Sequence, residues 1–87
     1  MMEEEARTGN IDLSRLLTDM VKAIVEHPDQ VNVAEERNGD SVTLTLTVDP
    51  ADTGMIIGRH GNIANSLRTV MRAASKITGD RVNVEIR

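Results

Sequence analysis

Residues 42–48 alternate apolar and polar side chains without interruption, reading Val-Thr-Leu-Thr-Leu-Thr-Val. Because successive side chains of a β-strand point to opposite faces, this segment predicts a strand with one face on a hydrophobic core and one in water. Residues 82–86, Val-Asn-Val-Glu-Ile, show the same alternation and predict a second strand of this kind. One-sided strands need a covering layer, which amphipathic helices would have to supply.

The first predicted helix lies before these strands. Asn10 is a good N-cap candidate, and the helical spacing continues to about His27, where Pro28 blocks the next turn. The residues expected to face the core are Leu13, Leu16, Leu17, Met20 and Ile24, with Val21 and Val25 widening the stripe.

Two further helices are predicted after the strand at 42–48. Asp49 is expected to cap the first of them, with Pro50 at its first helical position, and this short helix ends at Gly58. The other runs over about residues 62–77, and Gly79 is a suitable C-cap. Its expected core residues are Ile63, Leu67, Val70, Met71, Ala74 and Ile77.

A hairpin completes the predicted order. Val31 and Val33 alternate with polar neighbours, and Asn38-Gly39 is a tight-turn pair before the strand at 42–48. The order is therefore α-β-β-α-α-β, which favours an α+β two-layer sandwich with a three-stranded mixed sheet. The last strand follows a helical crossover and is expected to lie parallel to the second.

The amino-acid composition excludes several classes of function. The chain of 87 residues is expected to hold one domain over residues 10–87, after a disordered acidic tail at 1–9. It has no cysteine for thiol chemistry and no long apolar run for a membrane span, so we expect a cytoplasmic protein. With no Phe, Tyr or Trp, it lacks the stacking platforms of many nucleic-acid-binding modules.

Charge is unevenly distributed along the chain. The net charge is −4, but residues 1–54 carry −8 and residues 55–87 carry +4. Arg68, Arg72 and Lys76 lie four apart on the last helix and form a basic stripe. This part of the chain is a candidate phosphate-facing surface, although ordinary solvated helix charges would give the same pattern.

The loop between the last two helices, Gly58-Arg59-His60-Gly61, is the principal candidate for function. A turn with glycine at both ends lets a phosphodiester approach the main chain, and the next helix points its amides outward. Arg59 and His60 would meet phosphate oxygens, while Ile56 and Ile57 would offer apolar surface to bases. A plain connection between two helices is the alternative, since glycine commonly ends helices.

Catalytic and metal sites are not expected. His27 and His60 lie in different elements without a recognisable ligand spacing, and His27 is better explained as a favourable charge near a helix C-terminus. Asp49 and Asp52 are better explained as capping residues than as a carboxylate pair. We therefore expect neither an enzyme nor a cofactor.

The sequence resembles the type II KH domain, and within it the small bacterial KhpA-type proteins, over about residues 13–87. The resemblance is carried by residues 52–54, 57–61, 63–64, 67–70, 73–74 and 82–86. It implies that the GXXG loop clamps the backbone of about four nucleotides of single-stranded RNA, in a groove bordered by the last strand. The implied RNA-binding residues are Ile57, Gly58, Arg59, His60, Gly61, Asn62, Arg68 and Arg72.

The same resemblance implies partners and a strength of binding. It implies a homodimer, pairing with a larger Jag-type KH-containing protein, and RNA-level control of cell elongation and division. Positions 55, 62 and 65, often basic in this family, are Met55, Asn62 and Asn65 here, and His60 stands where lysine or glutamine is more usual. Weak, salt-sensitive binding with little sequence preference is therefore expected.

Two alternatives remain open at this stage. The loss of basic positions and the net negative charge are also typical of a KH fold used mainly for dimerisation, with vestigial RNA binding. Binding of single-stranded DNA is the other, because no residue is identifiable as a reader of the 2′-hydroxyl.

Overall fold

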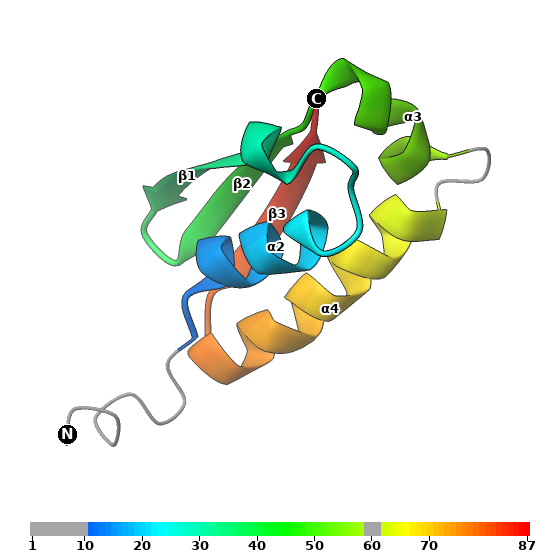
Figure 1. The fold of residues 1–87 in the computed structure, drawn as a ribbon. Coiled ribbons are helices and arrows are strands. Elements are labelled where there is room, and N and C mark those ends of the chain that lie inside the picture. The colour runs from blue at the N-terminus through cyan, green and yellow to red at the C-terminus, as the bar shows by residue number, and fades with distance from the viewer. Residues whose placement is uncertain (1–10, 59–61) are drawn as a thin grey trace, which may run out of the picture.

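A computed structural model describes residues 11–58 and 62–87 of the chain. The predicted order α-β-β-α-α-β is confirmed, with one short 3-10 helix added between the first helix and the hairpin (Figure 1). The elements are α2 (Leu13–Lys22), η1 (Pro28–Gln30), β1 (Asn32–Asn38), β2 (Ser41–Thr47), α3 (Pro50–Ile57), α4 (Asn62–Thr78) and β3 (Arg81–Ile86).

The three strands form one mixed sheet in the order β1-β2-β3. β1 and β2 are antiparallel, whereas β2 and β3 are parallel, as the helical crossover predicts. Helices α2 and α4 lie together on one face of this sheet, which gives the expected two layers (Figure 1). Since β2 is central, the outer edge of β3 pairs with no other strand of residues 11–58 and 62–87, and α4 packs against β3.

The alternation in β2 divides its side chains as predicted. Val42, Leu44 and Leu46 are almost fully buried against the helices, while Thr47 is exposed and the other two threonines are half-buried. The helices complete the core with Leu13, Leu17, Val21, Ile56, Leu67, Met71 and Ala74, and β3 adds Val84. The core is thus entirely aliphatic and thioether.

The first helix is shorter than predicted. Asp12 caps it by accepting a hydrogen bond from the Arg15 amide at 3.2 Å, and Asn10, the expected cap, lies outside the described residues. The helix ends at Lys22 instead of near His27. The amides of Glu26 and His27 are bound by a side chain from another element, so they cannot continue the helical ladder.

The predicted core stripe of α4 is too wide. Val70 and Ile77 were expected inside but are 42% and 58% exposed, and Ile24 of the first predicted stripe is 40% exposed. Helical spacing places these residues beside the buried face, yet no other described element covers them. Ala64 and Ser75, which the pattern did not select, are buried in their place.

The hairpin turn is centred one residue later than Asn38-Gly39. Asn38 pairs with Ser41, so Gly39 and Asp40 are the two central residues. Gly39 has φ 64° and Asp40 does not have a positive φ, which is the pattern of a type II′ turn. Beside this turn, Arg37 donates from both terminal nitrogens to the Asp80 carboxylate, at 3.0 and 3.3 Å. This pair joins β1 to the connection between α4 and β3.

Candidate nucleic-acid interface

The first glycine of the GXXG loop has a backbone geometry that few other residues adopt. Gly58 follows α3 with φ 63° and ψ −178°, and its amide donates to the Gly54 carbonyl at 2.7 Å. This combination of angles is nearly restricted to glycine, because a Cβ atom clashes with the adjacent backbone. Gly58 therefore ends α3 and turns the chain toward α4. The predicted residues Arg59, His60 and Gly61 lie outside the described residues.

The two isoleucines before the loop have different environments. Ile56 is fully buried in the core, whereas Ile57 is 45% exposed. Ile56 therefore holds α3 to the body of the domain and cannot line a groove. Ile57 remains the apolar side chain available to a ligand next to Gly58.

Helix α4 begins at Asn62 and carries the basic stripe along one flank. The side chain of Arg68 is half-buried and donates from Nε to the Val84 carbonyl of β3 at 3.4 Å. Arg72 and Lys76 are exposed and follow it at intervals of four residues. We call Arg68, Arg72 and Lys76 the basic flank. Because Arg68 contacts β3, this flank borders the outer edge of that strand.

The opposite flank of α4 is apolar. Val70 and Ile63 face the end of α2, where Met20 and Ile24 lie, and together they surround a hollow of about 420 Å³. We call the exposed surface around Ile24, Val70 and Ile77 the apolar flank. Sequence reasoning placed these residues in the core and so missed this surface. The buried face of α4 separates the apolar flank from the basic flank.

The predicted site residues are therefore only partly brought together. Ile57 and Gly58 lie at the end of α3 and Asn62 at the start of α4, one on each side of the loop. Arg68 and Arg72 lie progressively farther along α4, on the flank that borders β3. A ligand that contacts all of them has to run from the loop along α4.

Asp49 and Asp52 have different roles, although capping was expected to explain both. Asp49 caps α3, accepting a hydrogen bond from the Ala51 amide at 2.8 Å. Asp52 is buried and bonds outside its helix: it accepts from the amide of His27 at 3.0 Å and from the amide of Glu26 at 3.4 Å. Its Oδ2 also lies 3.1 Å from Nδ1 of His27. The capping interpretation of Asp52 is wrong because α3 turns this side chain inward.

A sequence signal for the role of Asp52 exists. Asp52 and Ile56 are four residues apart, so they share a face of α3. Once Ile56 is recognised as a core residue, an acid on that face requires buried donors. The donors come from the connection between α2 and β1, which only the tertiary structure identifies.

The contact changes the acidity of both partners. Burial by itself would raise the pKa of Asp52, but hydrogen bonds from His27 and Glu26 outweigh it and hold that pKa below its usual range. The hydrogen bond to Asp52 raises the pKa of His27 above 6.5, and the charges of Asp52, Asp49 and Glu26 act in the same direction. The earlier interpretation of His27 is also corrected: α2 ends five residues before it, so its partner is a carboxylate and not a helix terminus.

Residues 11–58 and 62–87 contain no cluster of three or more acidic, histidine or cysteine side chains suited to a metal ion. Within the same ranges, no helix is long and apolar enough to cross a membrane.

The order of elements, the mixed sheet and the glycine loop between α3 and α4 together define a type II KH domain. A solved structure of the same fold is "Crystal structure of Era in complex with MgGDPNP and nucleotides 1506-1542 of 16S ribosomal RNA", with a TM-score of 0.54 and 19% identity. The match covers 88% of this chain and 31% of the Era chain, so it concerns one part of that protein and supports the fold alone.

The chain belongs to the KhpA/KhpB KH-domain family, whose pattern matches residues 14–86. It is 42% identical over 74 residues to the RNA-binding protein KhpA of Clostridium acetobutylicum, covering 85% of this chain and 99% of that protein. The KhpA protein of Bacillus subtilis (strain 168) is 35% identical, with 85% and 91% covered. The KhpA protein of Aquifex aeolicus is 42% identical over 65 residues, which covers 75% of this chain and 82% of that protein. Membership of this family agrees with the expectation of a protein that is not an enzyme.

Proposed function

We propose that this protein binds short single-stranded RNA, with the GXXG loop clamping the backbone. The observation that carries the proposal is the position of the basic flank, which starts near the loop and borders the outer edge of β3. Phosphates would lie along the loop and the basic flank, and bases would face β3 and Ile57. The family relatives named above as RNA-binding proteins support this choice of ligand.

The chemistry of the groove fits a chain without aromatic residues. The first amides of α4 supply donors at a helix N-terminus, which favours an anion. Arg68 uses Nε for the Val84 carbonyl, so its two terminal nitrogens are the ones directed to phosphate. Ile57 supplies aliphatic contact in place of ring stacking. Affinity then depends on the backbone and little on the base sequence.

The number of cations sets the salt dependence. With about two or three phosphates neutralised, the logarithm of the association constant should fall with the logarithm of salt concentration at a slope of about −1.4 to −2. A slope steeper than about −4 would contradict a small interface of this kind. Measuring the same slope on DNA of identical sequence tests the preference for RNA.

The decisive variant replaces Arg59 and His60 with aspartate. Both carboxylates would then stand where phosphate is bound, while Gly58 and the core remain intact. We expect RNA binding to be lost, by more than about 50-fold, with an unchanged circular dichroism spectrum. Anisotropy of labelled RNA is the measurement, because the protein has no tryptophan or tyrosine.

The matched control carries a similar change of charge away from the groove. Arg15 and Lys22 lie on α2, outside the helix that carries the basic flank, and both are exposed. Arg15→Asp with Lys22→Asp should lower affinity only through the long-range field, which salt of about 0.15 M largely screens. Equal losses in the two double variants would mean that net charge, and not the loop, governs binding.

The apolar flank favours self-association as a second property, and we place the expected homodimer there. Val70 and Ile77 are large and exposed, and Val70 also lines the hollow, which is typical of a protein-binding surface. A dimer formed through this flank leaves the basic flank accessible, so it is compatible with RNA binding. Pairing with a Jag-type KH protein, and through it a role in cell elongation and division, belongs to the same proposal.

Val70→Asp tests the dimer. It should shift the protein toward monomer by at least about tenfold in dissociation constant, since the charge would be buried in the interface. Thr69→Asp, on the neighbouring exposed position, is the control and should leave the assembly unchanged. Sedimentation velocity measures both. If neither the wild type nor the loop variant binds RNA and the wild type is still a dimer, the protein is better described as a dimerisation module.

A further inference from the structure

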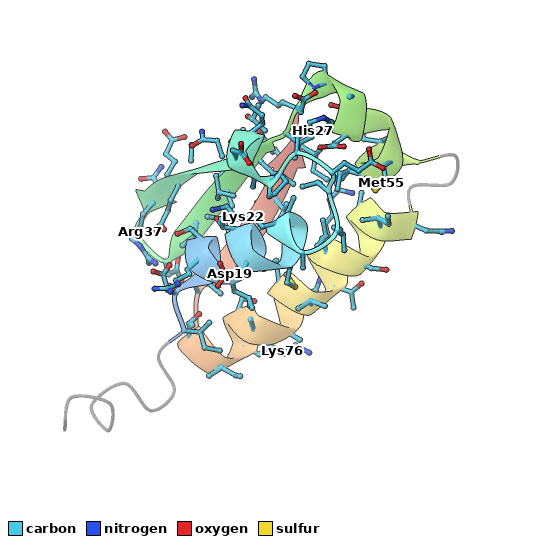
Figure 2. All side chains as sticks on the ribbon, viewed as in Figure 1. Asp19, Lys22, His27, Arg37, Met55 and Lys76 are labelled. Carbon is cyan, nitrogen blue, oxygen red and sulfur yellow. The ribbon has the colours of Figure 1, made fainter. Side chains whose placement is uncertain are left out.

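The connection between α2 and β1, residues 23–31, is held to α3 by one side chain. Asp52 accepts the amides of Glu26 and His27 and also contacts the His27 ring. The connection is also ordered at its two ends: the amides of Ala23, Ile24 and Val25 donate to carbonyls of α2, and those of Gln30 and Val31 donate to His27 and Pro28. Figure 2 shows His27 beside the start of α3. The Asp52 contact therefore joins two segments that are distant in sequence.

Helix α3 has few other attachments to the rest of the domain. It has only eight residues and packs chiefly against α4, with Ile56 as its fully buried apolar side chain. Among the described residues, Asp52 provides all the side-chain hydrogen bonds that α3 makes to another element. The end of the same helix is Gly58, where the GXXG loop begins. Asp52 and Gly58 are thus six residues apart along one helix, which is less than two turns.

The environment of His27 makes the contact sensitive to protons. The His27 side chain is 47% exposed and exchanges protons with water, whereas the Asp52 side chain is 2% exposed. The charged groups that act on His27 are Asp52 and Asp49 from α3 and Glu26 from the connection itself, and all three are acidic. A protonated ring therefore forms an ion pair with Asp52, whereas a neutral ring with its proton on Nδ1 donates a hydrogen bond to the carboxylate without the attraction between opposite charges.

We propose that protonation of His27 strengthens the attachment of the 23–31 connection to α3 and thereby increases RNA binding at the GXXG loop. The inference rests on the function proposed above and adds a regulation to that site. His27 is a positioning residue in this scheme, because it acts through Asp52 and α3 and does not touch RNA.

The direction of the effect follows from the two pKa shifts. The pKa of His27 is raised above 6.5, so its contribution is complete below 6.5 and is lost as the pH rises through the raised value. The pKa of Asp52 is lowered below 3.8, so the carboxylate stays charged throughout that interval. Attachment and RNA affinity should both decrease as the pH rises above 6.5.

The first experiment observes the contact without RNA. The two histidine rings of the full chain are titrated by NMR in the wild type and in Asp52→Asn. We expect the pKa of His27 to fall toward its ordinary value in the variant. Identical His27 titrations in the two proteins would overturn the proposal. If Asp52→Asn does not fold, Asp49→Asn removes a neighbouring charge and should produce a smaller decrease in the same pKa.

The same samples report whether the effect reaches the loop. The Gly58 amide is hydrogen-bonded to Gly54, so its protection from hydrogen exchange measures the order of the end of α3. Protection relative to intrinsic exchange should decrease with rising pH in the wild type and stay constant in His27→Gln. A protection factor that follows the same course in both proteins would overturn the coupling.

The second experiment measures RNA affinity between about pH 6 and about pH 8 in the wild type, His27→Gln and His60→Gln. The loop contains the second histidine, His60, so any direct effect of its charge on phosphate has to be separated from that of His27. In His60→Gln, we expect RNA affinity to fall about fivefold as the pH rises across this range. In His27→Gln, we expect this part of the pH dependence to be absent. Equal pH dependence in the wild type and His27→Gln would overturn the regulation and leave the RNA-binding function intact. If the wild type binds no RNA at any pH, the proposed function fails, and Gly58 protection still decides the coupling.

Discussion

The two ends of the domain are each closed by a contact between an acid and a base, and the chemistry of the two contacts differs. At the hairpin end, Arg37 binds Asp80 through two hydrogen bonds, and both side chains are partly open to water. At the loop end, the buried Asp52 binds the half-exposed His27. Figure 2 shows Arg37 and His27 far apart, on opposite sides of the ribbon.

The two contacts differ in the pH range over which their basic partner is charged. Arginine keeps its charge at every physiological pH, and Arg37 holds the pKa of Asp80 below its usual range. Histidine loses its charge near neutrality. The hairpin end is therefore held equally well over the whole range, whereas the end that carries the GXXG loop is held by a contact that protons can weaken. The contact that protons can weaken thus lies at the end where we propose that RNA binds.

The largest loss of stability is expected from a core substitution, which affects both ends of the domain equally. Leu67 is buried in the middle of α4, and Leu67→Ala should lower the free energy of unfolding by roughly 2–5 kcal/mol by leaving a cavity. In protein diluted until it is monomeric, Val70→Ala, three residues away on the exposed flank, should change it by less than about 0.5 kcal/mol. Urea unfolding measures both. Comparable losses at higher protein concentration would mean that Val70 is covered in solution, as in the proposed dimer.

Gly58→Ala should damage the loop end specifically. The angles of Gly58 are nearly closed to other residues, so we expect a loss of about 1–3 kcal/mol together with weaker RNA binding. Gly54→Ala is the control within the same helix, where a Cβ atom would meet nothing within 4 Å. It should raise stability by about 0.5–1 kcal/mol. A Gly58 variant as stable as the wild type would show that α3 can end in another way.

The pH dependence of stability should separate the ends without a change in the core. As the pH rises from 6.5 through the raised pKa of His27, the melting temperature of the wild type should fall. His27→Gln should show no such decrease, since glutamine does not titrate. A wild-type melting temperature that stays constant across this interval would argue against the Asp52–His27 ion pair.

The smallest effect is expected at the hairpin end. Arg37→Gln removes an exposed ion pair, and such pairs contribute little to stability, so the melting temperature should decrease only slightly. The decrease should be the same at about pH 6 and about pH 8, because Arg37 does not change its charge in that range. RNA affinity should be unaffected. A pH-dependent loss in this variant would remove the distinction between the two ends.

Local patterns were sufficient for most of the architecture. The alternation at residues 42–48 identified β2 and its buried face, and Asp49-Pro50 marked the start of α3. Gly58 was recognised as the end of that helix because its conformation is a property of the residue itself. The family motif around the loop identified the KH fold and the candidate RNA-binding residues, of which Arg59, His60 and Gly61 lie outside the described part of the chain.

The sequence by itself determined whatever depends on neighbours in the chain: the strands, the helix starts, the order of elements and the glycine at the loop. The tertiary structure alone decided where α2 ends, because the amides of Glu26 and His27 are taken by Asp52 from a helix 25 residues away. It also decided that Val70 stays outside the core, since helical spacing shows which residues share a face but not which elements cover it. Hydrogen bonds and burial between distant segments carry no local signature, and for that reason the Asp52 contact and the apolar flank became visible only in the folded chain.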